Sequence, residues 1–256
     1  MTETDTKKRP LGTRWCGIGS FMAGLGLVAA AVGLLGAALG ALSPIGAFSA
    51  FGLGLLLCAL SALVLLIGLV ISKGSGGAIA GGRAWGAWLV AVLVIVVSMS
   101  QRPTVEGAEG AVIHDVSTDV TNPPVFVEII AIREADGAAN PPEYSGEFTE
   151  TQLAAFPDIQ TLSVARTPGE VFAAAEGVVA ELGWEMVAAD AASGRIEATA
   201  STSFFRFKDD VVIRIKAAAG GSEVDIRSKS RVGQGDMGAN AARVREFLTR
   251  LQAATG

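Results

Sequence analysis

Three long stretches near the start of the chain contain no ionisable residue, and this feature most limits what the chain can fold into. Residues 15–42, 43–72 and 84–101 include no Asp, Glu, Lys, Arg or His. A helix needs about 20 mostly apolar residues to cross a bilayer core, so the first two stretches are long enough and the third is near the short limit. The sequence therefore predicts three transmembrane helices, at about 15–42, 46–72 and 84–101.

A cleaved signal peptide is the alternative explanation of the first stretch, because Ala38 to Gly40 offers a plausible cleavage site. However, the apolar run is much longer than the roughly 7 to 15 residues of a signal peptide's apolar region. A second apolar run also follows almost at once. A retained membrane helix is therefore the favoured interpretation.

Lysine and arginine residues in the short flanks predict the orientation of these helices. Positively charged flanks tend to stay on the cytoplasmic side of a membrane. Such residues precede the first span and separate the second from the third: Lys7, Lys8, Arg9, Arg14, Lys73 and Arg83. The turn at 43–47 has none, and Arg102 alone closely follows the third span. We expect a multi-pass protein of the cytoplasmic (inner) membrane, with a cytoplasmic tail at 1–14 and a periplasmic or other extracytoplasmic region after Gln101.

The predicted spans have the character of a tether. Transporters usually carry ionisable residues or broken helices at membrane depth, and these stretches have no ionisable residue. Gly24, Gly26 and Ala29 match a dinucleotide-binding fingerprint in letters only, since they lack its strand and turn. Together with Gly36 and Gly40 they are better explained by close packing between helices.

The region after the spans is acidic and poor in catalytic residue types. Residues 101–256 contain 14 Lys and Arg against 23 Asp and Glu, a net charge of 14 − 23 = −9, which disfavours nucleic acid as a partner. The region has no cysteine, and His114 is the one histidine of the chain. We expect no metal site and no cofactor, and a solvated His114 in the linker. The expected partners are the lipid bilayer and either another envelope protein or a lipid head group.

Residues 102–120 are predicted to be a linker, and residues 121–254 a soluble domain. Asn-Pro-Pro turns occur at 122–124 and 140–142, and the apolar run at 125–132 does not distinguish a strand from a helix. Clear order begins at Thr167, where Thr-Pro-Gly-Glu forms a capping box for an amphipathic helix that ends at Gly183.

Alternating apolar residues after this helix predict four strands. They begin near Trp184, Arg195, Val211 and Val224, and a last amphipathic helix follows Asp236, which can cap it. The predicted fold is therefore an α-helical anchor of three spans followed by an α+β domain, in which two helices pack on a four-stranded antiparallel meander.

The third and fourth strands predict their own register. Pairing Ile215 with Val224 and Ile213 with Ile226 puts both apolar sets on one face of the sheet. The same register places Lys216 opposite Glu223 and Arg214 opposite Asp225. A shift by two residues would bring Arg214 opposite Arg227, which the repulsion of like charges disfavours.

Polar residues concentrate on the fourth strand and just after it. The candidate anion-binding or ligand-binding residues are Arg227, Ser228, Ser230, Arg231, Asp236, Asn240 and Arg243, and their candidate polar partners are Asp210, Arg214, Asp225 and Glu197. One interpretation is a salt-bridged sheet face exposed to solvent. The other is an anion or head-group site where Arg231, Asn240 and the amides that open the last helix converge.

Enzymatic activity has little support from the residue types. No Gly-x-Ser-x-Gly motif occurs, and Asp209 and Asp210 are neighbours on a strand, so they should point to opposite faces. The favoured function is a binding or assembly module displayed outside the cytoplasm. The alternative is a hydrolase acting on an envelope substrate through Asp210 or Glu197, with Arg231 stabilising an anion.

The region from Thr121 to about Leu251 resembles a bacterial and plastid family known as domain of unknown function 1499. The similar segments are Asn122-Pro123-Pro124, Phe156 to Ile159, Gly183-Trp184, Arg195 to Thr199, Asp209 to Arg214, and the run from Val224 through Arg231, Gly233, Asp236, Gly238 and Asn240 to Arg243. Phe156 and Met237 stand where this family more often has Tyr and Leu. The resemblance implies that the Arg-Ser-x-Ser-Arg run belongs to the identity of the domain, and it implies no activity.

Overall fold

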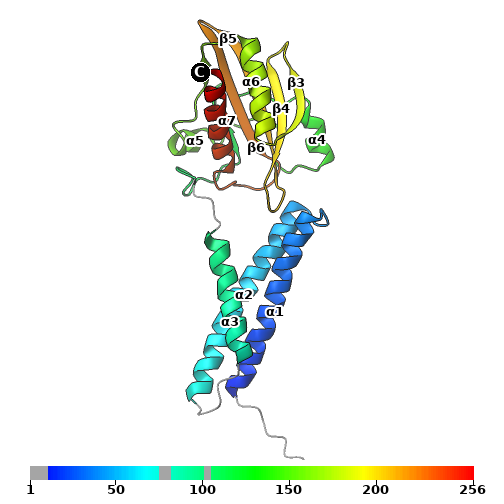
Figure 1. The fold of residues 1–256 in the computed structure, drawn as a ribbon, viewed down its shortest axis with the longest axis vertical. Coiled ribbons are helices and arrows are strands. Elements are labelled where there is room, and N and C mark those ends of the chain that lie inside the picture. The colour runs from blue at the N-terminus through cyan, green and yellow to red at the C-terminus, as the bar shows by residue number, and fades with distance from the viewer. Residues whose placement is uncertain (1–10, 75–81, 101–104) are drawn as a thin grey trace, which may run out of the picture. The chain divides into compact units, whose positions relative to one another are not determined.

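A computed structural model describes residues 11–74, 82–100 and 105–256 of the chain. The chain divides into two compact units. The first contains three helices, α1 (Leu11–Ala38), α2 (Pro44–Gly74) and α3 (Gly82–Ser100), and the second contains every strand (Figure 1).

Two of the three N-terminal helices are long and apolar enough to cross a membrane. These are Leu11–Ala38 and Pro44–Ser72, of 28 and 29 residues. The third predicted span falls on α3, whose apolar part within the described residues is shorter, Gly86–Val97. The structure therefore supports two candidate spans and leaves the third as a prediction.

Helices α1 and α2 pack closely on small residues. A Cβ atom added to Gly26 would lie 2.8 Å from the carbonyl oxygen of Gly54, and one added to Gly33 would lie 2.6 Å from that of Ala47. These distances leave no room for a side chain. Gly24, by contrast, has no atom within 4 Å of such a Cβ. Of the glycines that matched the fingerprint, Gly26 therefore packs against α2 and Gly24 does not.

The second unit is built on a six-stranded antiparallel sheet with the order β1-β6-β5-β4-β3, in which β2 also pairs with β6. The strands are β1 (Asp115–Ser117), β2 (Leu162–Val164), β3 (Glu185–Asp190), β4 (Arg195–Ser201), β5 (Lys208–Ala218) and β6 (Gly221–Ser230). The predicted four-stranded meander corresponds to β3 to β6. The predicted number of four strands was too low. The prediction missed β1 and β2 because they are only three residues long and carry no alternating pattern.

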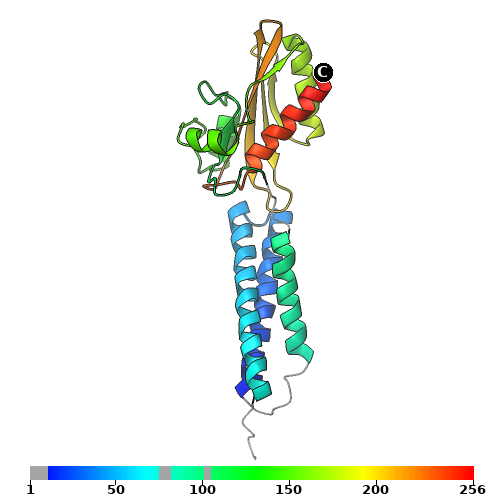
Figure 2. The same ribbon diagram turned by 90° about the vertical axis from the view of Figure 1, so that its left-hand side faces the viewer.

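Helices lie on both sides of this sheet. Helices α6 (Pro168–Glu181) and α7 (Ala239–Thr255) lie side by side on one face, which we call the inner face (Figure 1). The residues between β1 and β2, 118–161, include α4 (Ile129–Ala135) and α5 (Thr149–Ala155) and lie on the opposite, outer face (Figure 2). We call residues 118–161 the cover segment. The sheet is therefore enclosed on both faces.

The main hydrophobic core lies between the inner face and α6 and α7. Ile196, Ile213 and Ile226 come from the sheet, Val171 from α6 and Phe247 from α7, and all five are fully buried. Trp184 stacks on Phe247 with ring centroids 5.9 Å apart. The predicted inward positions are thus confirmed by burial.

Several local predictions are confirmed as well. Thr167 and Glu170 form the capping box of α6. The β5–β6 register pairs Ile213 with Ile226 and Arg214 with Asp225, as the charge argument required.

The segments before Thr167 differ from the predictions in two places. The undecided run 125–132 leads into α4, which begins at Ile129. The predicted linker 102–120 supplies β1, whose three residues pair with β6 and are all buried. Part of the expected linker is thus an integral element of the sheet.

The β3–β4 turn depends on a glycine. Gly194 has φ +66°, and a Cβ there would lie 2.2 Å from the carbonyl oxygen of Ile215. Gly194→Ala should therefore lower the free energy of unfolding by about 1 to 3 kcal/mol, measured by urea unfolding of the detergent-solubilised chain. Gly220→Ala is the matched control, because Gly220 also has positive φ, +89°, but has no atom within 4 Å. Equal losses in the two variants would contradict the steric argument.

Candidate functional site

The outer face of the sheet carries charged side chains that the cover segment buries. Pointing outward are Glu197 and Thr199 from β4, Asp210 and Arg214 from β5, and Asp225, Arg227, Lys229 and, just after the strand, Arg231 from β6. Arg227, Lys229 and Arg231 are only 1%, 2% and 4% exposed. The sheet face is salt-bridged, as one interpretation of the sequence expected. However, it is not solvated, because the cover segment lies over it (Figure 2).

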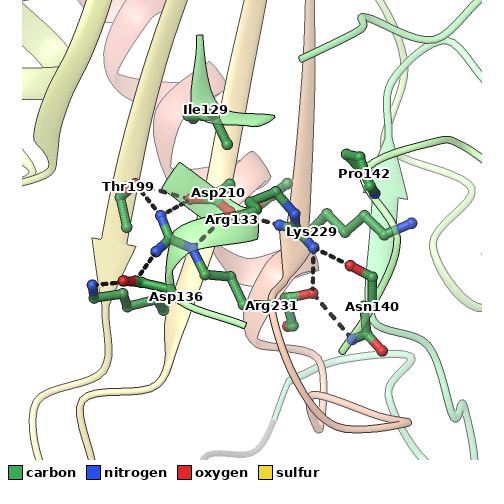
Figure 3. A network of polar contacts seen from close by, with 12 residues as sticks. Ile129, Arg133, Asp136, Asn140, Pro142, Thr199, Asp210, Lys229 and Arg231 are labelled. Atoms are coloured by element: carbon green, nitrogen blue, oxygen red, sulfur yellow. Dashed lines mark hydrogen bonds and ion pairs between the residues drawn. The ribbon is translucent and has the colours of Figure 1, made fainter. Parts of the chain in front are cut away.

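Asp210 is the centre of the first ionic cluster and is fully buried. Its Oδ2 atom accepts hydrogen bonds from Arg133 Nη1 at 2.6 Å and Arg231 Nε at 2.9 Å. Its Oδ1 atom accepts from Arg231 Nη2 at 2.7 Å and from the Thr199 hydroxyl at 2.8 Å. Figure 3 shows the two guanidinium groups approaching this carboxylate, that of Arg133 from α4 and that of Arg231 from just after β6. Both oxygens are therefore occupied by donors from the protein itself.

Asp136 connects this cluster to the surface. Its carboxylate pairs with Arg231 and accepts a hydrogen bond from Lys208 Nζ at 2.7 Å (Figure 3). The hydrogen bond from Lys208, with the nearby charge of Arg231, lowers the pKa of Asp136 below its ordinary value of 3.8. The ionic cluster thus runs from a buried centre to a half-exposed rim.

Asp136, at this rim, should make the stability of the domain depend on pH under acidic conditions. The pKa of Asp136 in the folded chain lies below 3.8. Its contribution to the stability of the fold is therefore present above pH 3.8 and is lost as the pH falls through the folded pKa. Asp136→Asn should therefore make the free energy of unfolding less steeply dependent on pH below 3.8. Urea unfolding of both chains across acidic pH measures this slope. Parallel curves for the variant and the parent chain would contradict the assignment.

Asp115 is the centre of a second cluster, at the β1 edge of the sheet. It forms a bidentate pair with Arg227, with Nε and Nη2 each 2.8 Å from a carboxylate oxygen. Lys229 Nζ lies 3.0 Å from the same carboxylate and donates to the Glu143 carbonyl at 2.8 Å. Burial lowers the pKa of Lys229, although the charge of Asp115 opposes this shift.

The guanidinium of Arg227 is also held by the cover segment. It lies over the rings of Phe126 and Tyr144, at 4.9 and 5.2 Å from their centroids. It donates to the carbonyls of Pro124 and Pro142, the two Asn-Pro-Pro turns of the sequence. Arginine suits such a position because its planar group stacks and donates in several directions at once. The two Asn-Pro-Pro turns therefore help to hold the guanidinium of Arg227 in place.

Glu197 holds the start of α4 and is fully buried. Its two oxygens accept from the backbone amides of Val127 at 2.8 Å and Ile129 at 2.9 Å. Arg195 Nε lies 3.0 Å from one of these oxygens.

Asp225 and Arg214 pair as the register predicted. Arg214 donates to Asp225 at 2.7 Å and also to Asp119 of the cover segment at 3.0 Å. Thr118 and Thr161, the two ends of the cover segment, both donate to Asp225. The outer face and the cover segment are thus joined at every cluster.

The remaining candidate residues lie on the inner face and form a separate network. Asn240 Oδ1 accepts from the hydroxyl of Ser228 at 2.6 Å and from Arg243 at 2.7 Å, and its amide donates to Ser230. Arg243 also pairs with Asp209 at 2.7 Å. Asp209 and Asp210 therefore do point to opposite faces.

Asp236 occupies the amides at the start of α7. Its carboxylate accepts from the backbone N–H of Gly238 at 2.8 Å and of Asn240 at 2.7 Å. Burial raises its pKa above 3.8. Arg231 belongs to the outer face, whereas Asn240 and these amides belong to the inner face. The structure therefore does not bring them together, and the carboxylate of Asp236 stands where the predicted anion would bind.

His114 is buried, contrary to the expectation of a solvated linker residue. It is 9% exposed, its Nδ1 lies 3.1 Å from the carbonyl oxygen of Gln234, and its ring packs edge-to-face on Phe148. Within residues 11–74, 82–100 and 105–256, no group of three His, Cys, Asp or Glu residues could hold a metal ion.

Two residues of these clusters were not among the candidates from the sequence: Asp115, the centre of the second cluster, and Arg133, a partner of Asp210 in the first. Asp115 lies in a three-residue strand and Arg133 in a seven-residue helix. An unmatched excess of Arg and Lys on the outward positions of β6 was a usable signal, because buried cations require partners from elsewhere in the chain.

Fold and site together define a sheet domain with one apolar face and one buried ionic face, preceded in the chain by apolar helices. Residues 115–251, more than half of the chain, match the family described as "Protein of unknown function (DUF1499)", and the chain belongs to that family. The match confirms the resemblance drawn from the sequence. No curated protein matches the chain.

Proposed function

We propose that this protein is a membrane-tethered binding or assembly module of the cell envelope, and that its domain catalyses no reaction. The observation that carries the proposal is the state of the carboxylates that a hydrolase would need. Asp210 and Glu197 are fully buried, and each of their oxygens accepts hydrogen bonds from protein donors. A general acid, base or nucleophile must reach its substrate, so these groups support a structural role.

The hollow beside α6 gives no support to catalysis. It lies between the start of α6 and the β3–β4 turn and is lined by Pro168, Gly169, Phe172, Ser193 and Ile215 among others. No ionisable side chain lines it. It could accommodate an apolar group but supplies no acid, base or metal ligand.

The tether is supported by the two long apolar helices, and we propose α3 as a third span. The Lys and Arg residues before α1 and between α2 and α3 favour a cytoplasmic N-terminus and a domain on the other side of the inner membrane. The absence of ionisable residues in the predicted spans favours an anchor over a transporter.

Labelling of single cysteines in intact cells tests this topology. Ala219→Cys, in the exposed β5–β6 turn, should react with a membrane-impermeant maleimide, and Thr4→Cys should react only after permeabilisation. Cys16 and Cys58 are buried, so the unsubstituted chain provides the background. Labelling of Ala219→Cys only after permeabilisation would contradict the proposed orientation.

Native mass spectrometry of the detergent-extracted chain tests the binding role. A module of this kind should retain a lipid or a protein partner as additional mass. A monodisperse, unliganded species under conditions that keep the domain folded would count against it.

A further inference from the structure

The regularly spaced glycines of α1 fall into two sets. Four of them are buried at intervals of seven residues: Gly12, Gly19, Gly26 and Gly33. A Cβ atom on each would lie less than 3.0 Å from an atom of α2. Gly17 and Gly24 are also seven residues apart, but they are exposed, and no atom of the described chain lies within 4 Å of such a Cβ. Glycine destabilises a helix interior relative to alanine, so these two positions need an explanation other than packing on α2.

Gly17 lies in a hollow on the exposed face of α1, which we call the α1 hollow. It has a volume of about 520 Å³ and is lined by five residues: Thr13, Arg14, Gly17, Ile18 and Phe21. Three of these are three or four residues from Gly17, so they border it on one face of the helix. Ile18 and Phe21 are 51% and 69% exposed. The missing side chain at Gly17 therefore leaves a continuous apolar hollow, of a volume typical of small-ligand sites.

Arg14 is the one charged residue that lines the α1 hollow, and it has no carboxylate partner in its unit. The described residues of the three helices, 11–74 and 82–100, contain no Asp or Glu. Arg14 is exposed, and its neighbour Trp15 is 37% exposed. A basic residue and a tryptophan at the end of an apolar helix are typical of the lipid head-group level. This placement rests on the proposed function, in which α1 is a membrane span.

We propose that the α1 hollow binds one anionic phospholipid. Arg14 donates to the oxygens of the lipid phosphate, for which a guanidinium has several suitable donors. One acyl chain lies over Gly17, between Ile18 and Phe21, and contacts the helix more closely than a side chain at position 17 would allow. An anionic head group is preferred to a zwitterionic one, because no carboxylate of these helices balances the charge of Arg14.

A second copy of the chain is the alternative occupant of this face. Two copies inserted in the same orientation would bring their Arg14 residues next to each other if they packed through the α1 hollow. The repulsion of these like charges disfavours that arrangement. A lipid phosphate in the same place is attracted.

Native mass spectrometry of lipid binding tests the site on the full chain. The delipidated chain in a neutral detergent is titrated with phosphatidylglycerol or with phosphatidylcholine of the same acyl chains, and the Kd of the first bound lipid is measured. Phosphatidylglycerol should bind about fivefold more tightly, which corresponds to about 1 kcal/mol, the attraction of one basic residue to anionic lipid. Arg14→Gln should weaken its binding about fivefold. Gly17→Leu, which fills the hollow and keeps the charge, should weaken it at least as much.

Gly24→Leu is the matched control. It adds the same side chain to an exposed glycine of the same helix, in a stretch, 15–72, that contains no ionisable residue. The Kd of phosphatidylglycerol should therefore stay unchanged in this variant. Unchanged near-UV circular dichroism verifies the folding of all three variants.

Each contrary result has its own meaning. Equal affinities of the parent chain for the two lipids would overturn the proposal, as would an Arg14→Gln variant that binds phosphatidylglycerol like the parent. Equal effects of Gly17→Leu and Gly24→Leu would overturn it as well. A dimer that Gly17→Leu dissociates would show that a second copy covers this face, which also excludes the lipid site.

Failure of the proposed function is distinguishable from failure of the lipid site. A parent chain that stays monodisperse without detergent would show that α1 is not a span, and the tether and the lipid site would then fall together. A chain that needs detergent but does not prefer phosphatidylglycerol would remove the lipid site alone.

Discussion

Asp210→Asn should lower the free energy of unfolding of the domain by about 3 to 5 kcal/mol, the range expected when one partner of a buried ion pair is removed. The substitution keeps the shape of the side chain but removes its charge. Arg133 and Arg231 are 2% and 4% exposed and would lose the carboxylate that both contact. Neither can lose its proton, since guanidinium groups stay charged in proteins. The penalty should therefore not change with pH above neutrality.

Urea unfolding of the detergent-solubilised chain, followed by near-UV circular dichroism, measures this loss. Asp158→Asn is the matched control, because Asp158 also pairs with an arginine, Arg245, but its side chain is 54% exposed. A surface pair of this kind contributes up to about 1 kcal/mol. If Asp210→Asn cost no more than the control, the buried cluster would not be a stabilising element of the fold.

Asp115→Asn should cause a loss of similar size, about 3 to 5 kcal/mol at neutral pH, that alkaline conditions partly reverse. The variant leaves Arg227 and Lys229 in a buried site without their carboxylate. Burial already lowers the pKa of Lys229 below 10.5, and Asp115 opposes that shift. Without Asp115 the folded pKa should fall further. Between this folded value and 10.5 the unfolded chain binds more protons, so stability rises with pH.

The two aspartate variants therefore differ in a measurable way. From neutral to alkaline pH, the free energy of unfolding relative to the parent chain should rise for Asp115→Asn. For Asp210→Asn it should stay constant. The double variant Asp115→Asn with Lys229→Met removes the titrating group, so its relative stability should not rise with pH. A rise of equal size in the double variant would show that another group is responsible.

The parts of the fold that the sequence predicted are those set by local patterns. The register of β5 and β6 follows from alternating Ile and Val residues with opposite charges between them, and α6 follows from its capping box. The cover segment has no such local pattern, and backbone carbonyls make part of its contacts with the charged side chains of the sheet. For example, the carbonyls of Pro142 and Glu143 bind Arg227 and Lys229, and no residue type reveals a backbone acceptor.

The sequence identified most of the residues of the candidate site but not how they are arranged. Alternation along β6 separates Arg227, Lys229 and Arg231 from Ser228 and Ser230, and the structure confirms that the two sets face opposite sides of the sheet. The predicted convergence of Arg231 with Asn240 was wrong, because the two residues lie on opposite faces of the sheet. Whether a charged face lies in solvent or under another segment depends on long-range packing, here on α4 and the two Asn-Pro-Pro turns.

Strand β6 pairs along one edge with both strands that flank the cover segment, with β1 at 227–229 and with β2 at 222–224. Ribosomes make the chain from its N-terminus, so residues 115–164 exist well before the strand that they pair with. Asp115 and Arg227, for instance, are 112 residues apart. Until β6 is synthesised, β1, the cover segment and β2 have no strand to pair with. They remain accessible to proteases and can pair with incorrect strands. Folding of this domain should therefore be late and slow, as expected for contacts of large sequence separation.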